Sequence, residues 1–250
     1  MTEIIAVVSH KGGTGKTSLV QNLAYELSNH RVLAVDLDAQ SSLTVGCGLD
    51  PAIERQTLYH ALHDPDATAE IIVKLEHFDL LPANLDLALA EHQFIDHPDR
   101  NDKLKDVLAQ IDYNYDYILI DSPPSLGFFA FNGPAAATQM IVPLQCEPYA
   151  YKTLDHTLQV VELIKQSNPL LELKAVVLTM YDRRLTLTRS VEGTVRQRFT
   201  DLVPQTVIPV NVSIAEATLD GEPVGVYSPF STGSQAYKAL AKELYGTCRE

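Results

Sequence analysis

The chain has 250 residues, of which 46% are hydrophobic and 20% charged, and its formal net charge is −13. Its length suits one sizeable α/β domain over residues 1–250, because no linker, repeat or low-complexity run divides it. No apolar run approaches the length of a membrane span, and Cys47, Cys146 and Cys248 form neither a disulfide framework nor a CxxC metal pair. We therefore expect a cytoplasmic protein with no membrane anchor.

The negative charge is unevenly distributed along the chain. Residues 1–150 contain 8 Lys and Arg against 21 Asp and Glu, whereas residues 151–250 contain 11 of each kind. The neutral C-terminal part permits an anionic partner on that side of the molecule.

The first predicted elements are a buried strand at residues 3–9 and a helix at residues 18–27, separated by a glycine-rich turn. Such a turn directs backbone N–H groups inward, and the helix N-terminus adds its positive dipole end. We therefore predict a cage for phosphate oxygens, in which Lys16 reaches the outer phosphates and Thr17 ligates magnesium. The expected nucleotide-binding residues of this turn are Lys11, Gly12, Gly13, Thr14, Gly15, Lys16, Thr17 and Ser18.

A second buried strand is predicted within residues 31–40, and it ends in Asp36 and Asp38. Open α/β folds place ligands at the carboxyl ends of their strands, so we expect both aspartates to point toward the phosphate loop. They share one strand face only if the extended conformation continues to Asp38.

Residues 50–115 carry weaker signals. They predict helices at residues 57–62, 84–94 and 102–111 and a strand at residues 77–82. The histidines show no metal-binding spacing such as HExxH, so we expect them to be surface or core residues.

A strand at residues 116–121 delivers Asp121 into the turn Ser122-Pro-Pro-Ser125. A carboxylate at a strand end, followed by a rigid turn, suits a magnesium–water relay that senses the γ-phosphate. By itself, a strand-terminal aspartate is as often a turn cap. Together with the phosphate loop, it predicts that Asp121 binds magnesium through water.

The remaining pattern predicts strands at residues 139–144 and 173–179 and helices at residues 154–164 and 188–199. A last helix at residues 233–246 ends at a glycine. Strands that alternate with helices indicate an α/β fold with a doubly wound, mostly parallel β-sheet flanked by helices.

These motifs resemble those of the deviant Walker A ATPases, the family of ParA, Soj and MinD, whose loop reads Lys-Gly-Gly-x-Gly-Lys-Thr. The resemblance implies that Lys11 reaches across a dimer to the partner's ATP. It also implies that Asp38, the second aspartate of the family's Asp-x-Asp-Pro-Gln, is the hydrolytic carboxylate, with Ala39 in place of proline. Asp121 corresponds to the aspartate of the family's Asp-Cys-Pro-Pro-Ser.

Residues 207–216 are similar to the family's loop Ile-Pro-Arg-Asn-Val-Arg-Leu-Ser-Glu, which packs on the adenine. Pro209 and Asn211 match this loop, whereas Val210 and Ser213 replace two arginines. The resemblance therefore implies that Pro209 and Asn211 help to bind the nucleotide.

The resemblance further implies a P-loop ATPase that uses ATP and Mg²⁺ and hydrolyses ATP slowly. Its catalytic residues would be Lys11, Lys16 and Asp38. An ATP-dependent homodimer would bind nonspecific DNA and associate with the nucleoid. A ParB-like protein or another ATPase-stimulating partner would help it to position a plasmid, a chromosome region or other cargo.

Five arginines near the last predicted strand are the candidate DNA-binding residues: Arg183, Arg184, Arg189, Arg196 and Arg198. Arg189 and Arg196 are seven residues apart, so they share one face of a helix. The alternative interpretation is a solvated helix whose arginines pair with Asp182 and Glu192.

Three other functions are weighed against this one. The acidic composition favours a positioning switch that acts on a protein scaffold without binding DNA. An electron-transfer ATPase is disfavoured because paired cluster cysteines are lacking. A small-molecule kinase or synthetase is a further alternative.

Overall fold

The computed structural model describes residues 2–54, 56–124, 127–148 and 150–249. This part of the chain forms a seven-stranded sheet in the order β3-β4-β2-β5-β1-β6-β7. All neighbouring strands are parallel except β3 and β4. The strands are β1 Glu3–Val7, β2 Val32–Asp36, β3 Val73–Lys74, β4 Asp79–Leu81, β5 Tyr117–Asp121, β6 Gln139–Gln145 and β7 Glu172–Thr179. The predicted doubly wound, mostly parallel sheet is confirmed.

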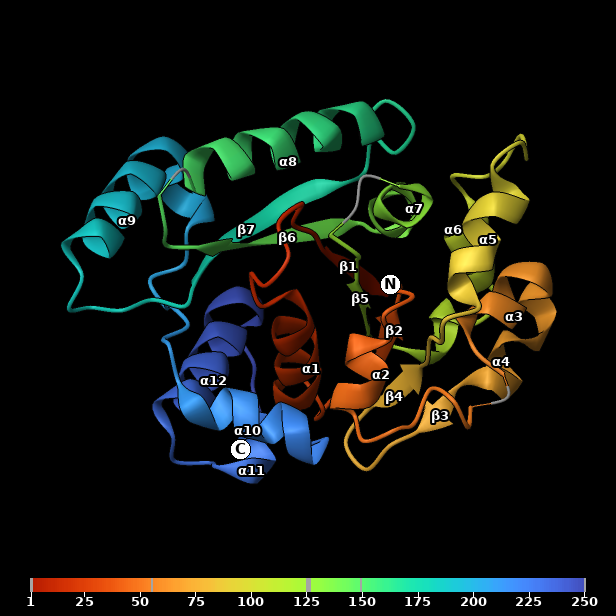
Figure 1. The fold of residues 1–250 in the computed structure, drawn as a ribbon, viewed down its shortest axis with the longest axis horizontal. Helices are drawn as coiled ribbons and strands as arrows, with labels where there is room; N and C mark the ends of the chain where they lie inside the picture. The colour runs from red at the N-terminus through yellow and green to blue at the C-terminus, as the bar shows by residue number, and fades with distance from the viewer. Residues whose placement is uncertain (1, 55, 125–126, 149, 250) are drawn as a thin grey trace.

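Helices cover both faces of the sheet (Figure 1). One face carries α1 Lys16–Glu26, α2 Ser42–Gly46, α10 Val212–Asp220, α11 Val224–Tyr227 and α12 Thr232–Tyr245. The other face carries α3 Leu58–His63, α4 Thr68–Ile71, α5 Leu87–Phe94, α6 Lys103–Ala109, α7 Phe128–Ala136, α8 Ala150–Ile164 and α9 Thr186–Phe199. Short 3₁₀ turns are η1 Pro65–Ala67, η2 Asp112–Asn114 and η3 Thr200–Leu202. Within the described residues, no helix is both long enough and apolar enough to cross a membrane.

The central strands are apolar between their ends because each face of the sheet is buried. Ile5 and Val7 of β1 pack toward α1, whereas Ala6 and the following Val8 pack toward α8. Alternate residues of a strand point to opposite faces, so a sheet covered on both sides needs continuous apolar runs. This arrangement places every parallel strand's carboxyl end at one edge of the molecule.

Several boundaries differ from the sequence-based prediction. Strands β1 and β2 end at Val7 and Asp36, so the extended conformation does not continue to Asp38. The segment expected to be a loop over residues 207–216 becomes helix α10 at Val212, because the Asn211 side chain accepts a hydrogen bond from the Ser213 N–H. The last helix ends before Gly246, at φ 70°, as predicted.

Helices α2, α4, α7 and α11 and strand β3 were not predicted. Helix α7 is buried along most of its length and contains Gly133 and Pro134, so its sequence lacks a one-sided apolar stripe. Helices α2 and α11 span only five and four residues, which is too short for a periodic signal.

Candidate functional site

The glycine-rich turn connects β1 to α1 at the carboxyl edge of the sheet. Gly13 and Gly15 have φ angles of 75° and 86°, which favour glycine. A Cβ atom built on Gly12, Gly13 or Gly15 would meet no atom of the described residues within 4 Å. Gly15 is the N-cap of α1, and no side chain in the described part of the chain caps this helix end. The N–H groups of the first turn of α1 are therefore available to an anionic ligand.

Lys16, Thr17 and Asp121 meet beside this turn. Asp121 ends β5 opposite Val7 of β1, so the strand register carries it to the turn. The Thr17 hydroxyl donates a hydrogen bond of 2.6 Å to Asp121 Oδ2, whereas Asp121 Oδ1 is buried without a hydrogen-bond partner among the described residues. Lys16 is only 7% exposed. An unpartnered buried carboxylate oxygen beside a hydroxyl fits a hydrated magnesium ion.

Burial dominates the ionisation of this cluster. It raises the pKa of Asp121 to about 8, and the neighbouring Asp36 raises it further, while Thr17 and Lys16 oppose the rise. Burial also lowers the pKa of Lys16, against the attraction of Asp121 and Asp38. Each shift follows from the cost of a charge away from water, and a bound cation would favour the carboxylate form of Asp121.

The two aspartates after β2 have different surroundings. Asp36 is fully buried, and its Oδ2 accepts hydrogen bonds from the N–H and the hydroxyl of Thr44 at 2.9 and 2.7 Å. Asp38 is partly exposed, and its Oδ1 accepts a bond from the Gln40 N–H at 3.0 Å. Asp36 therefore fastens α2 to the sheet through Thr44, and it also lies opposite Asp121 in the strand register, next to the phosphate loop. That both carboxylates point toward the loop stays a prediction.

Lys11 is held by the segment after β6 rather than standing free in water. Its ammonium group forms an ion pair with Glu147 and lies 3.5 Å from Gln145 Oε1. These contacts join residues more than 130 positions apart. No local spacing in the sequence indicates that Glu147 is the partner of Lys11.

The end of β7 links the phosphate loop to the segment around Pro209. The Thr179 hydroxyl donates a 2.9 Å hydrogen bond to the carbonyl oxygen of Thr14, in the loop. Two residues later, Tyr181 forms a parallel bridge with Pro209. Met180 between them has a φ angle of 47°, an uncommon conformation outside glycine. Asn211, which caps α10, also donates a 2.8 Å bond to the Thr232 hydroxyl.

The arginine segment, residues 183–198, carries the five candidate DNA-binding arginines, and three of them form ion pairs within the chain. Arg184 pairs with Asp182, Arg196 with Glu192, and Arg198 with Asp155. Arg196 also donates to the Val203 carbonyl at 3.0 Å, and its side chain is only 23% exposed. Arg189 and Arg196 therefore do not form one open basic face, because Arg196 serves as an internal brace.

Arg183 and Arg189 are exposed. Among the described residues, neither has a carboxylate within ion-pair distance. They are the arginines of this segment whose charge is available to an outside partner.

Three residues that hold the site in place were not singled out from the sequence. Thr44 binds Asp36, Thr179 binds the Thr14 carbonyl, and Glu147 binds Lys11. Each contact crosses between separate elements, so no local spacing signals it. In the described part of the chain, no cluster of three or more His, Cys, Asp or Glu side chains could hold a metal by itself. A magnesium ion here would need phosphate oxygens and water as further ligands.

The chain is similar to known proteins over most of its length. A family model described as an AAA domain matches residues 2–173. The sporulation initiation inhibitor protein Soj of Bacillus subtilis is 40% identical over 249 residues, covering 98% of each chain. The chromosome partitioning protein ParA of Caulobacter vibrioides is 39% identical, covering 99% of this chain and 95% of that protein.

A solved structure of similar fold is that of cobyrinic acid a,c-diamide synthase from Mycobacterium smegmatis with bound ADP and magnesium. It is 35% identical with a TM-score of 0.85, and the match covers 97% of this chain and 93% of that one. That relative thus binds a nucleotide and a magnesium ion on the same arrangement of strands and helices.

Proposed function

The chain belongs to the ParA/MinD superfamily of P-loop ATPases, and we propose that it is an ATP-driven positioning protein. It binds ATP with Mg²⁺, hydrolyses ATP slowly, and forms a sandwich homodimer in the ATP state. The dimer binds nonspecific DNA and is stimulated by a ParB-like or other partner protein. Together they position a plasmid, a chromosome region or other cargo.

The observation that carries the proposal is the contact between Thr17 and Asp121 beside the open glycine turn. In this arrangement the N–H groups of residues 12–18 surround the phosphates and Lys16 binds the outer ones. Thr17 and, through water, Asp121 would hold the magnesium ion. When bound, that ion would supply positive charge that offsets the negative charge of the phosphates. Asp38 orients the attacking water, and Pro209 and Asn211 contact the base.

The role of Lys11 requires a second copy of the chain. A residue that acts on the partner's ATP must first leave the Glu147 carboxylate that holds it here. Lys11→Ala should therefore retain ADP binding but fail to form an ATP-dependent dimer, as measured by light scattering. Glu147→Gln serves as the matched control and should still dimerise. If Lys11→Ala dimerises like the parent, Lys11 does not act in trans.

A second candidate function is supported by the arginine segment. Three of its five arginines are engaged with acidic side chains of the same chain, and Val210 and Ser213 stand where relatives of this family carry arginine. With few free cations, the chain would act as a nucleotide switch on a protein scaffold, because DNA affinity depends on Lys and Arg that neutralise phosphates.

A salt titration of duplex DNA binding separates the two functions. The protein is titrated onto labelled duplex with ATP and Mg²⁺, with ADP and Mg²⁺, and without nucleotide. The DNA-dependent function predicts affinity in the ATP state alone, decreasing linearly on a log–log scale as salt rises. Absence of binding with ATP even at low salt, where the Debye length is long, would support the scaffold function.

A further inference from the structure

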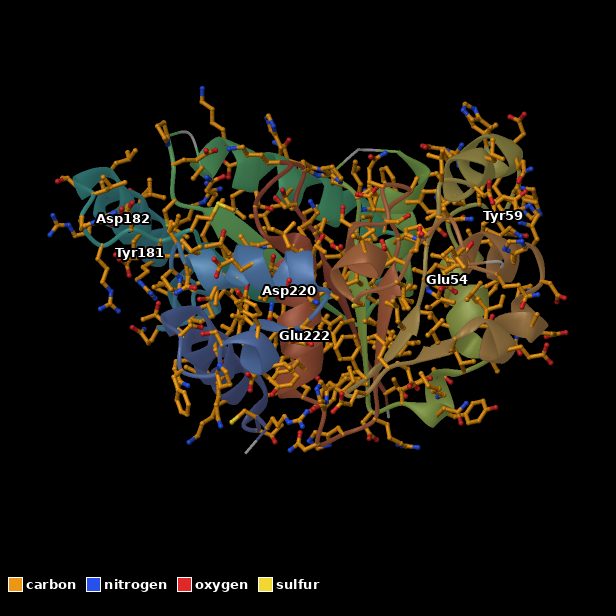
Figure 2. The ribbon with its side chains drawn as sticks, turned by 60° about the horizontal axis from the view of Figure 1, so that its bottom comes forward. Glu54, Tyr59, Tyr181, Asp182, Asp220 and Glu222 are labelled. Atoms are coloured by element: carbon orange, nitrogen blue, oxygen red, sulfur yellow. The ribbon has the colours of Figure 1, made fainter. Side chains whose placement is uncertain are left out.

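A groove lies beside α9, on the outer side of the segment that follows β7. It has a volume of about 710 Å³ and is bounded by the chain after β7, the 205–210 segment and the start of α12. Figure 2 shows Tyr181 and Asp182 at this end of the molecule, far from Glu54 and Tyr59. The residues that matter for its chemistry are Tyr181, Arg183, Arg184, Val210 and Phe230.

Phe230 is an unusual lining residue because it is 95% exposed. A ring this exposed can be approached by a ligand, and it lacks the free energy that burying its apolar surface would contribute. The turn that carries it is nevertheless held in place. Gln235 donates a 2.8 Å bond to the Pro229 carbonyl, and the Ser231 N–H donates a 3.0 Å bond to the Ser228 carbonyl. The backbone that carries Phe230 is therefore held in place, and its ring is uncovered.

The groove also carries available positive charge. Asp182 is neutralised by Arg184 through bonds of 2.7 to 3.3 Å. Arg183 lines the groove, and Arg189 lies in the first turns of α9, directly after the 182–185 loop; neither has an ion-pair partner among the described residues. Gln205 and Thr206, which line the groove, donate their N–H groups to the Glu243 carboxylate. The charged residues that line the groove are Asp182, Arg183 and Arg184, so their net charge is positive.

We propose that this groove binds single-stranded nucleic acid, with a base stacked on Phe230 and the neighbouring phosphates on Arg183 and Arg189. An open aromatic ring beside arginines is the arrangement by which proteins bind unpaired bases, and duplex bases cannot offer a free face to it. Val207, Pro209 and Val210 also line the groove, so a peptide is the competing occupant that the test below distinguishes. The inference rests on the proposed function only in taking a nucleic acid as the partner.

The test compares oligo(dT) with duplex DNA of equal length, both labelled, by fluorescence anisotropy at low salt with ATP and Mg²⁺. Phe230→Ala should weaken oligo(dT) binding by about 5- to 100-fold, the effect of losing one stacked base. Phe230→Trp should retain the affinity, because it keeps a stacking face. Leu219→Ala is the matched control, since Leu219 is also exposed, at 87%, but lies on α10 outside the groove. Duplex binding should be unchanged in all three variants.

Several outcomes would overturn the inference. If the parent binds duplex but not oligo(dT), the groove does not select unpaired bases, and the proposed function is unaffected. If it binds neither, the DNA part of the proposed function fails as well. Equal losses on both DNAs in Phe230→Ala would also contradict a stacking role. Phe230-dependent binding of a labelled acidic, leucine-rich peptide without oligo(dT) binding would make the groove a protein-docking surface.

Discussion

The phosphate-loop edge and the arginine segment both carry charged residues that the sequence singled out, yet they are built differently. At the loop, Thr17 and Asp121 come from elements more than 100 residues apart and meet in a buried cluster. In the arginine segment, Arg184 pairs at the surface with a carboxylate two residues away, and Arg196 pairs with one four residues away in a partly buried contact. The glycine-rich turn requires a particular backbone conformation, so its residues predict a candidate binding site. A run of arginines sets no backbone conformation, so it does not predict which of them are available to a partner.

The energetic reason is that the charged groups at the phosphate loop are buried, whereas most of those in the arginine segment are exposed to water. A buried carboxylate without a partner is costly, so its position has to be matched by the fold or by a ligand. An exposed ion pair contributes only about 0–1 kcal/mol, so surface charges can form or exchange partners with little effect on stability. The four predictions that follow test this contrast.

The largest effect is expected at Lys16. Lys16→Ala should weaken Mg·ATP binding by about 100-fold or more, because removing one member of a buried charge pair costs roughly 2–5 kcal/mol. Isothermal titration calorimetry measures the loss, and Arg189→Ala, in the other region, should bind ATP like the parent. Near-normal affinity of Lys16→Ala would place the phosphate site elsewhere.

Asp38→Ala should separate binding from hydrolysis within the same region. It should keep ATP affinity and lower single-turnover hydrolysis by about 100-fold or more, the range for removing a group that activates water. Asp66→Ala makes the same change of net charge at an exposed position away from the loop and should have parental turnover. Unchanged turnover in Asp38→Ala would move the hydrolytic role to another residue.

The arginine segment should split into two classes of residue. Arg183→Glu with Arg189→Glu should lower duplex affinity by about 10-fold and make the salt dependence shallower by about one unit per lost phosphate contact. The melting temperature should stay at the parental value because both residues are exposed.

Arg196→Glu is the matched contrast. It removes the brace to Glu192 and to the Val203 carbonyl, so it should destabilise the protein by about 1–3 kcal/mol, measured by chemical denaturation. If instead Arg196→Glu leaves stability unchanged and abolishes DNA binding, the contact seen in the folded chain does not define its role.

The smallest effect concerns a buried charge with no proposed function. Burial raises the pKa of Glu26 on α1 from 4.5 to about 7, although Lys238 and Arg249 oppose the rise. The folded state then binds more protons than the unfolded state between these values, so this residue reduces stability as pH rises from about 4.5 to 7.

Glu26→Gln should therefore raise the melting temperature above pH 7 and leave it nearly unchanged below pH 4.5. Thermal unfolding across this pH range measures the difference. Glu222→Gln is the control, because Glu222 is exposed and should show no such trend. A pH-independent shift would mean that packing, rather than ionisation, explains the Glu26 effect.

Much of the fold and of the phosphate site could be predicted from the sequence alone. The strand predicted at residues 3–9 is β1, Glu3–Val7, and the glycine turn, Thr17 and Asp121 lie together as expected, because each depends on local backbone requirements and on the rule that parallel strands end at one edge. The roles that the family resemblance implies for Lys11, Asp38 and Asn211 stay predictions. Short helices and the exact ends of strands were missed, because they leave no periodic pattern.

Only the tertiary structure decided which charged groups are available to a partner. It placed Asp36 against Thr44, Lys11 against Glu147 and Arg196 against Glu192, and it left Arg183 and Phe230 open at the surface. A residue type and its spacing set what a side chain can bind, but burial and the nearest opposite charge decide what it does bind. Those neighbours come mostly from distant parts of the chain, so they exist only once the sheet and its two helical layers have assembled.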